Sequence, residues 1–184
     1  MDQVCSIETF IGGSFQPATK TFPSINPANG QLVADIPDSD GYDVDRAVNA
    51  AMNAFDAWSE MGIKKRSDIL LKVSDILESR LEVFAKYESQ EQGKPVWLAK
   101  QLDIPRAVYN FRHFATTALS DLDSSCITHE TGLVNYSIHE PLGVAAIITP
   151  WNLPLYLLTF KLAPALIYGN TVVAKPSEMT SITG

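Results

Sequence analysis

The chain has 184 residues, of which 46% are hydrophobic and 19% are charged, which is typical of a globular protein and excludes a disordered one. Its formal net charge is −7, and no stripe of lysines and arginines offsets it. This charge argues against a nucleic acid or an anionic membrane as partner.

The first forty residues predict two strand pairs that lead into a helical region. Residues 10–15 are typical of a β-hairpin that turns at Gly12-Gly13. Strands over Phe22–Ile25 and Gln31–Ile36 follow, and Asn29-Gly30 is the turn signal between them.

Helices are predicted between residues 40 and 122. The first has Asp40 as its N-cap and Asp43 in its first turn. Its apolar face consists of Val44, Ala47, Val48, Ala51, Phe55 and Trp58. The second is expected from about Lys64 to Gln92, and its inward face consists of Ile69, Leu70, Val73, Leu77 and Phe84. The third is expected from about Val96 to Leu122, where Pro105 should kink it or leave one carbonyl unpaired.

Residues Leu133–His139 alternate between apolar and polar side chains, as in a strand with one covered face. Such a half-apolar ribbon needs something to cover it. A hairpin that folds back on its own domain is one interpretation.

The segment from Gly143 to Glu178 predicts a strand, a helix and a second strand. Val144–Ile148 and Thr171–Ala174 are continuous apolar runs, which suit strands buried on both faces. Leu155–Tyr168 lies between them and is too short to span a bilayer. A right-handed crossover would place the two strands side by side and parallel, so we expect an α/β fold.

Polar residues follow both of these strands, at the edge of a parallel sheet where ligands bind. Asn152 offers an amide N–H, Lys175 offers a cation, and Glu178 offers an acceptor suited to a ribose diol. An oxyanion and a nucleotide are the ligands that such groups serve. The alternatives are that Asn152 caps the helix or supports the turn before it, and that Lys175 and Glu178 form a surface pair.

The motifs PWNLP, KLAPALxxGN and VVAKPSE in this segment resemble the NAD(P)-dependent aldehyde dehydrogenase superfamily, and the resemblance runs from about Phe10 to the last residue. It implies the N-terminal portion of that α/β fold: a β-hairpin lead-in, three long helices, a protruding oligomerisation hairpin and the start of a Rossmann-like parallel sheet. Residues 8–122 would belong to the NAD-binding domain, 123–141 would form the oligomerisation hairpin, and 142–184 would form the first, incomplete βαβ unit. No GxGxxG motif is present, and the family lacks one here too.

The resemblance also implies roles for residues of the site. Asn152 would donate to the oxyanion formed from an aldehyde. The cofactor-binding residues would be Ile147, Ile148, Thr149, Trp151, Lys175, Ser177 and Glu178. Because a carboxylate repels a 2′-phosphate, Glu178 favours NAD over NADP. Lys161 would support the structure near the site.

On the substrate side, Leu153, Leu157 and Phe160 resemble the wall of an aldehyde tunnel, although ordinary core packing explains them equally well. The run Asp103-Ile104-Pro105-Arg106 resembles a branch of the family whose substrate carries a carboxylate. Arg106 would bind that carboxylate; the alternative is a helix-surface arginine. Asp103 resembles a carboxylate near the family's monovalent-cation site.

The nucleophilic cysteine and the general-base glutamate of the family are not identifiable. Cys5 lies near the N-terminus, Cys126 lies in a polar turn, and the three histidines show no metal or triad spacing. Two cysteines and no secretory pattern predict the cytoplasm.

We therefore expect the N-terminal portion of an NAD-dependent aldehyde dehydrogenase, homo-oligomeric as a dimer or tetramer when complete and inactive as the chain given. The rivals are a shortened product that regulates full-length subunits and an incomplete chain without independent function.

Overall fold

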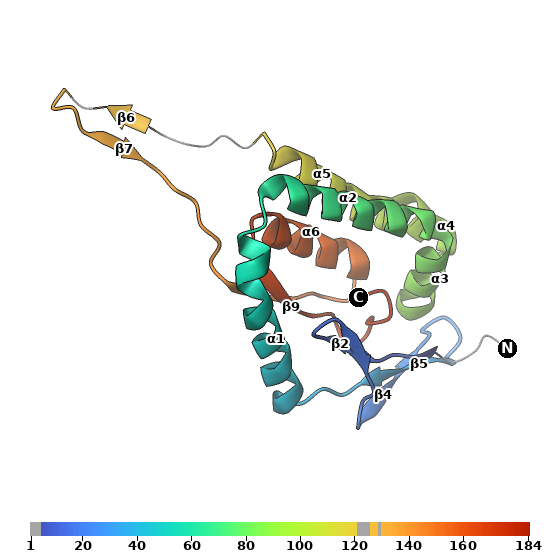
Figure 1. The fold of residues 1–184 in the computed structure, drawn as a ribbon. Helices are drawn as coiled ribbons and strands as arrows, with labels where there is room; N and C mark the ends of the chain where they lie inside the picture. The colour runs from blue at the N-terminus through green and yellow to red at the C-terminus, as the bar shows by residue number, and fades with distance from the viewer. Residues whose placement is uncertain (1–4, 121–125, 129) are drawn as a thin grey trace.

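The computed structural model describes residues 5–120, 126–128 and 130–184, which form an α/β fold (Figure 1). Short strands open the chain: β1 (Cys5–Ser6), β2 (Thr9–Ile11), β3 (Ser14–Gln16), β4 (Thr21–Ile25) and β5 (Leu32–Pro37). The helical region comprises α1 (Gly41–Ser59), α2 (Ile63–Ser79), α3 (Leu81–Gln92), α4 (Val96–Leu98), the π-helical turn η1 (Ala99–Asp103) and α5 (Ile104–Thr117). The last elements are β6 (Cys126–Thr128), β7 (Val134–Tyr136), β8 (Val144–Ile148), α6 (Pro154–Ile167) and β9 (Thr171–Lys175). Within the described ranges, no helix combines the length and the apolar character that crossing a membrane requires.

The lead-in strands confirm the two predicted strand pairs. Strands β2 and β3 are antiparallel and turn at Gly12-Gly13, where both residues have positive φ. Strands β4 and β5 are also antiparallel, and Gly30 has a φ of 71° at the end of their turn. Strand β1 adds to β5 in parallel.

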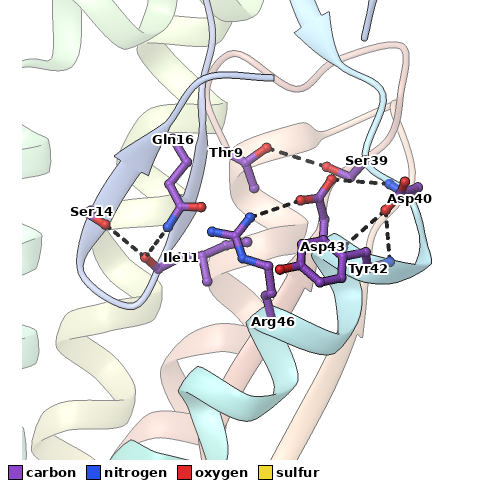
Figure 2. A network of polar contacts seen from close by, with 9 residues as sticks. All are labelled: Thr9, Ile11, Ser14, Gln16, Ser39, Asp40, Tyr42, Asp43 and Arg46. Atoms are coloured by element: carbon purple, nitrogen blue, oxygen red, sulfur yellow. Dashed lines mark hydrogen bonds and ion pairs between the residues drawn. The ribbon is translucent and has the colours of Figure 1, made fainter. Parts of the chain in front are cut away.

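The start of α1 anchors the first hairpin (Figure 2). Asp40 accepts hydrogen bonds from the backbone N–H groups of Tyr42, at 2.8 Å, and Asp43, at 3.3 Å. Asp43 in turn accepts from the Asp40 N–H, so the two residues form a capping box. The hydroxyls of Thr9 and Ser39 lie 3.5 Å apart and link β2 to this helix start. The predicted N-cap is confirmed.

The single helix predicted from Lys64 to Gln92 is wrong, because two helices occupy this range. The chain leaves helical geometry at Arg80, which has φ −110° and ψ 18°. Figure 1 shows α3 running at a steep angle to α2. The break turns Glu91 of α3 toward β4, where it accepts a hydrogen bond from Ser24. Neither glycine nor proline marks the break, so no helix stop signal is present there.

The inward face predicted for the second helix is wrong in part. Ile69 and Val73 are 37% and 38% exposed, whereas Ser67 and Ser74 are completely buried. The Ser67 hydroxyl donates to the carbonyl of Ala115 on α5, at 2.8 Å. Small serines on the contacting face allow α2 and α5 to pack closely, so the buried stripe differs from the most apolar one.

The third helix, predicted from Val96 to Leu122, is interrupted before Pro105 as expected. The interruption takes the form of η1, in which the Ile104 N–H donates to the carbonyl of Ala99. The extra residue in this turn places Pro105 in the first turn of α5. The predicted end is wrong, since α5 ends at Thr117; residues 121–122 lie outside the described ranges.

Strands β8 and β9 pair in parallel and α6 connects them, as predicted. Gly169, with φ 90°, ends α6, and the Asn170 N–H donates to the carbonyl of Ala165 at 3.0 Å. The side chain of Trp58 donates to another carbonyl of the last turn, that of Leu166, at 3.0 Å. These contacts fix the point at which the chain enters β9.

The hairpin formed by β6 and β7 projects away from the rest of the chain (Figure 1). Its apolar residues Val134 and Tyr136 are 54% and 67% exposed, and Ile138 beyond it is 68% exposed. The interpretation in which this hairpin folds back on its own domain is therefore wrong. Its apolar side chains face solvent in the described part of the chain.

Candidate functional site

The carboxyl ends of β8 and β9 meet at one edge of their sheet. Ile148 pairs with Lys175, and the Thr149 N–H donates to the Lys175 carbonyl at 3.3 Å. The polar segments that follow the two strands therefore begin side by side, as the sequence predicted. Ile147 and Thr149 are buried, while Ile148 is exposed.

Asn152 follows β8 with its side chain exposed to solvent. Its amide makes no hydrogen bond with any residue that the structure describes, whereas its backbone carbonyl accepts from Gln92 Nε2. Leu153, and not Asn152, is the N-cap of α6, so the interpretation of Asn152 as a helix cap is wrong. Trp151 beside it is 56% exposed.

Three further side chains hold the segment from Ile148 to Tyr156. Lys161 donates from Nζ to the carbonyl of Ile148 at 2.7 Å, which agrees with its predicted supporting role. Asn110 of α5, which is buried, donates to the carbonyl of Tyr156 at 3.1 Å. Glu88 of α3 accepts from the backbone N–H of Leu155 at 3.4 Å. The Asn152 amide thus extends from a fixed backbone.

The last residue of β9 and the turn after it present a lysine and a glutamate to solvent. Lys175 Nζ lies 3.3 Å from Glu178 Oε2, and these side chains are 61% and 67% exposed. A backbone N–H and then Lys175 lower the pKa of Glu178. Ser177 is buried, and its hydroxyl accepts from the Met179 N–H at 3.2 Å. Its side chain therefore serves the turn, and a role in cofactor binding remains a prediction.

Arg106 lies on α5 against the start of α6. Its guanidinium carbon is 5.3 Å from the centre of the Tyr156 ring. Among the described residues it pairs with no carboxylate, unlike Arg112 on the same helix, which pairs with Asp75 and Glu78. The cation of Arg106 is thus available to an anionic ligand.

The predicted tunnel residues lie along α6. Leu153 and Leu157 are half-buried, and Phe160 is 48% exposed. The Phe160 ring lies 6.2 Å from those of Tyr156 and Phe114. This arrangement is compatible with a tunnel wall and with ordinary packing.

Asp103 is 1% exposed and pairs with the ammonium of Lys94. A monovalent cation at Asp103 would compete with this ammonium, so the predicted cation site remains a prediction. In the described ranges, no three His, Cys, Asp or Glu residues come together as metal ligands would.

Sequence reasoning missed two buried carboxylates on α3, Glu88 and Glu91, which are 0% and 4% exposed. Burial raises the pKa of each to about 7, against the opposing effect of the hydrogen bonds they accept. The signal in the sequence was spacing. Glu88 and Glu91 follow Ala85 at helical steps, so they share a face of α3 with this completely buried residue.

Cys126 lies exposed on β6, in the projecting hairpin, and Cys5 lies in β1. Figure 1 shows the hairpin extending away from the loops that follow β8 and β9. Cys126 is therefore badly placed to attack a ligand bound near Asn152.

Comparison with known proteins identifies the family of the chain and the part of its relatives that it spans. The family model of the aldehyde dehydrogenase family matches residues 15–184. The chain is 49% identical to 2-aminomuconic semialdehyde dehydrogenase of Danio rerio and 46% identical to that of Homo sapiens, in each case over 177 residues. These alignments cover 96% of this chain but 36% of each relative, so the chain spans about a third of their length.

A solved structure matches the chain over a similar share of its length. The NAD+ complex of an aldehyde dehydrogenase from Bacillus cereus superposes with a TM-score of 0.92 at 36% sequence identity. The match covers 97% of this chain and 37% of that structure.

Proposed function

Because this chain belongs to the aldehyde dehydrogenase family, we propose that it supplies the oxyanion donor and part of the cofactor site of an enzyme that oxidises an aldehyde to a carboxylic acid. The observation that supports this most directly is the side-chain amide of Asn152. It is exposed, has no partner among the described residues, and extends from a backbone held by Gln92 at the carboxyl end of β8.

Asn152 would act when a nucleophile adds to the aldehyde carbon and the carbonyl oxygen becomes an oxyanion. An amide N–H held in advance at that position stabilises the developing charge, and removal of one such donor typically costs about 10²–10³ in rate. The contact of Lys161 with Ile148 would keep the start of this loop in place. The protein would then spend little free energy on reorganisation during the reaction.

The residues after β9 suit the ribose of NAD+. Glu178 has acceptor oxygens for a ribose diol, Lys175 has ammonium hydrogens to donate, and both side chains are exposed. A carboxylate here would also reject a 2′-phosphate, which supports NAD over NADP. The backbone of Ile147, Ile148 and Thr149, together with Trp151, would line the nicotinamide side. When bound, NAD+ supplies the hydride acceptor of the oxidation.

The proposed substrate is 2-aminomuconic semialdehyde, which the names of the most similar relatives specify. Arg106 would bind a carboxylate of this substrate, because its guanidinium is exposed and pairs with no described acidic side chain. Stacking on Tyr156 would orient the guanidinium without neutralising it. Leu153 and Leu157 would line the path of the aldehyde. The complete enzyme is proposed to be a cytoplasmic homo-oligomer.

The chain of 184 residues is expected to have no dehydrogenase turnover by itself. The reaction needs a thiolate to attack the aldehyde and a base to activate water, and neither can be assigned here. To test this, the purified chain is incubated with NAD+ and a semialdehyde, and NADH formation is followed by absorbance. Turnover that Cys126→Ala abolishes would contradict the proposal.

The role of Asn152 is tested in the protein as its own cells make it, whose length intact-mass analysis establishes. If that product is longer and active, Asn152→Ala should lower kcat about 10²–10³-fold with little change in KM. Asn53→Ala, at an exposed position of α1, is the matched control. A normal kcat in Asn152→Ala would exclude the oxyanion role.

The projecting hairpin favours a second candidate function. Its exposed Val134 and Tyr136 lie next to backbone edges that another strand could pair with. If the native product ends at Gly184, the chain would bind full-length subunits through this hairpin and regulate them without catalysis.

This alternative is tested by co-purification of the tagged chain with a full-length subunit. Capture that is lost in Tyr136→Asp, but not in the exposed control Tyr109→Asp, would support it. Capture that is equally strong in both variants would exclude the hairpin as the contact.

A further inference from the structure

One helix, α3, holds the loop that carries Asn152. Gln92 donates from Nε2 to the Asn152 carbonyl, and Glu88 accepts from the N–H of Leu155, three residues later. Gln92 and Glu88 are one helical turn apart, so they extend from the same face of α3. The loop is therefore tied to α3 at two points.

The same helix also holds the turn that follows β9. Glu91 accepts the backbone N–H groups of Ser181 and Ile182, one on each carboxylate oxygen, both at 2.9 Å. Glu88 Oε2 accepts from the hydroxyl of Thr183 at 2.8 Å. Glu88 thus contacts the two loops of the candidate site at once, one with each of its oxygens. Figure 1 shows the C-terminal end beside α3 and the start of α6.

The surroundings of these carboxylates are buried and acidic. Asp103 adds a third buried carboxylate, and Lys94, which faces Glu88, already pairs with Asp103. Burial raises the pKa of Glu88 and of Glu91 to about 7, with smaller contributions from the charge of Asp103 at Glu88 and from that of Glu88 at Glu91. Both groups therefore change protonation near neutral pH.

We propose that Glu88 and Glu91 are positioning residues that couple the loop carrying Asn152 to the turn that follows Glu178. The functional meaning of the coupling rests on the function proposed above, while the coupling itself rests on the contacts of the two carboxylates. An ionised carboxylate accepts strongly on both oxygens, whereas in a protonated one the hydroxyl oxygen is a weaker acceptor. Ionised Glu91 therefore holds Ser181 and Ile182 more strongly than protonated Glu91 does. The turn should be better ordered above pH 7 than below it, and the affinity for NAD+ should be higher there.

The coupling is tested by amide NMR of the full chain labelled with nitrogen-15, titrated from about pH 6 to about pH 8. The signals of Leu155, Ser181 and Ile182 should shift with midpoints near pH 7. Glu91→Gln should remove the shift at Ser181 and Ile182, and Glu88→Gln should remove the shift at Leu155. The matched control is Glu82→Gln, at an exposed position of the same helix, which should change none of these signals. Signals that stay constant with pH, or shifts that persist in the Gln variants, would overturn the proposal.

A second measurement separates positioning from a purely structural role. The affinity for NAD+ is measured by calorimetry at pH 6 and at pH 8, together with the free energy of unfolding. The wild-type chain should bind severalfold more weakly at pH 6, and Glu91→Gln should bind equally at the two pH values. Binding by the wild type that does not depend on pH would overturn the positioning role. If NAD+ does not bind at either pH although the amides titrate, the proposed cofactor function fails and the coupling stands.

Discussion

Two pairs of ionisable side chains show how differently glutamates behave in two regions of this molecule. Lys175 and Glu178 lie exposed at the end of β9, where a backbone N–H and the lysine lower the pKa of the glutamate. Glu88 and Glu91 lie buried on α3, where desolvation raises the pKa of each to about 7. The exposed pair is accessible to a ligand, whereas the buried pair accepts hydrogen bonds from the backbone around it.

Hydrogen bonding and burial therefore act in opposite directions on the pKa of a carboxylate. Glu91 accepts two backbone N–H groups and the hydroxyl of Ser24, and these contacts favour the ionised form. Burial nevertheless has the larger effect on its pKa. At Glu178, water solvates the charge, so a backbone N–H and then Lys175 are enough to lower the pKa.

The largest expected effect is a dependence of stability on pH. Because the pKa values of Glu88 and Glu91 are raised from 4.5 to about 7, the folded chain binds these protons more tightly than the unfolded chain. Their stabilisation is fully present below about pH 4.5 and is lost as the pH rises through about 7. Each carboxylate should lower the free energy of unfolding by about 3 kcal/mol across that window. Denaturant unfolding at several pH values measures the loss.

The control for this effect is the double variant Glu88→Gln/Glu91→Gln, which has no carboxylates at these positions. Its free energy of unfolding should be much flatter with pH than that of the wild-type chain. An equally steep decline in both proteins would assign the pH dependence to other groups.

A somewhat smaller effect is expected when a buried and an exposed carboxylate are each removed. Glu88→Ala leaves a cavity and the Leu155 N–H without its partner, so it should destabilise the fold by about 2–3 kcal/mol at pH 7. Glu178→Ala should change stability by less than about 0.5 kcal/mol. Equal losses in the two variants, measured by denaturant unfolding, would contradict the comparison.

For NAD+ binding, we expect the exposed carboxylate to matter more than the buried one. Glu178→Gln should weaken NAD+ binding by about tenfold, the worth of about one charge-assisted hydrogen bond, with an unchanged free energy of unfolding. Calorimetry measures the affinity, and Glu82→Gln is the surface control. An affinity that Glu178→Gln leaves unchanged would show that the exposed pair is no more than a surface ion pair.

The smallest effect is expected at Lys161. Lys161→Met keeps the aliphatic stem but removes the hydrogen bond to Ile148, so stability should fall by about 0.5–1 kcal/mol. Lys175→Met, which removes an exposed ammonium, should leave stability unchanged within about 0.5 kcal/mol. Thermal unfolding of the two variants side by side distinguishes these outcomes.

Local sequence patterns were enough to predict the β8–α6–β9 unit and the place of the two loops of the candidate site. Continuous apolar runs, Pro154 at the helix start and Gly169 at its end are local signals, because the backbone geometry of a strand or of a helix end depends on neighbouring residues. Parallel pairing then required Thr149 and Lys175 to lie at one edge. The family resemblance added roles that no local pattern contains.

Which polar side chains are buried, and where the long helices break, depends on tertiary contacts. Glu88, Glu91 and Ser67 look like surface residues in the sequence, and the break at Arg80 has no glycine or proline beside it. Their environments depend on contacts with residues far along the chain, such as Ser181 with Glu91 and Ala115 with Ser67. A local pattern records how polar a residue is, whereas burial depends on what the rest of the chain brings against it.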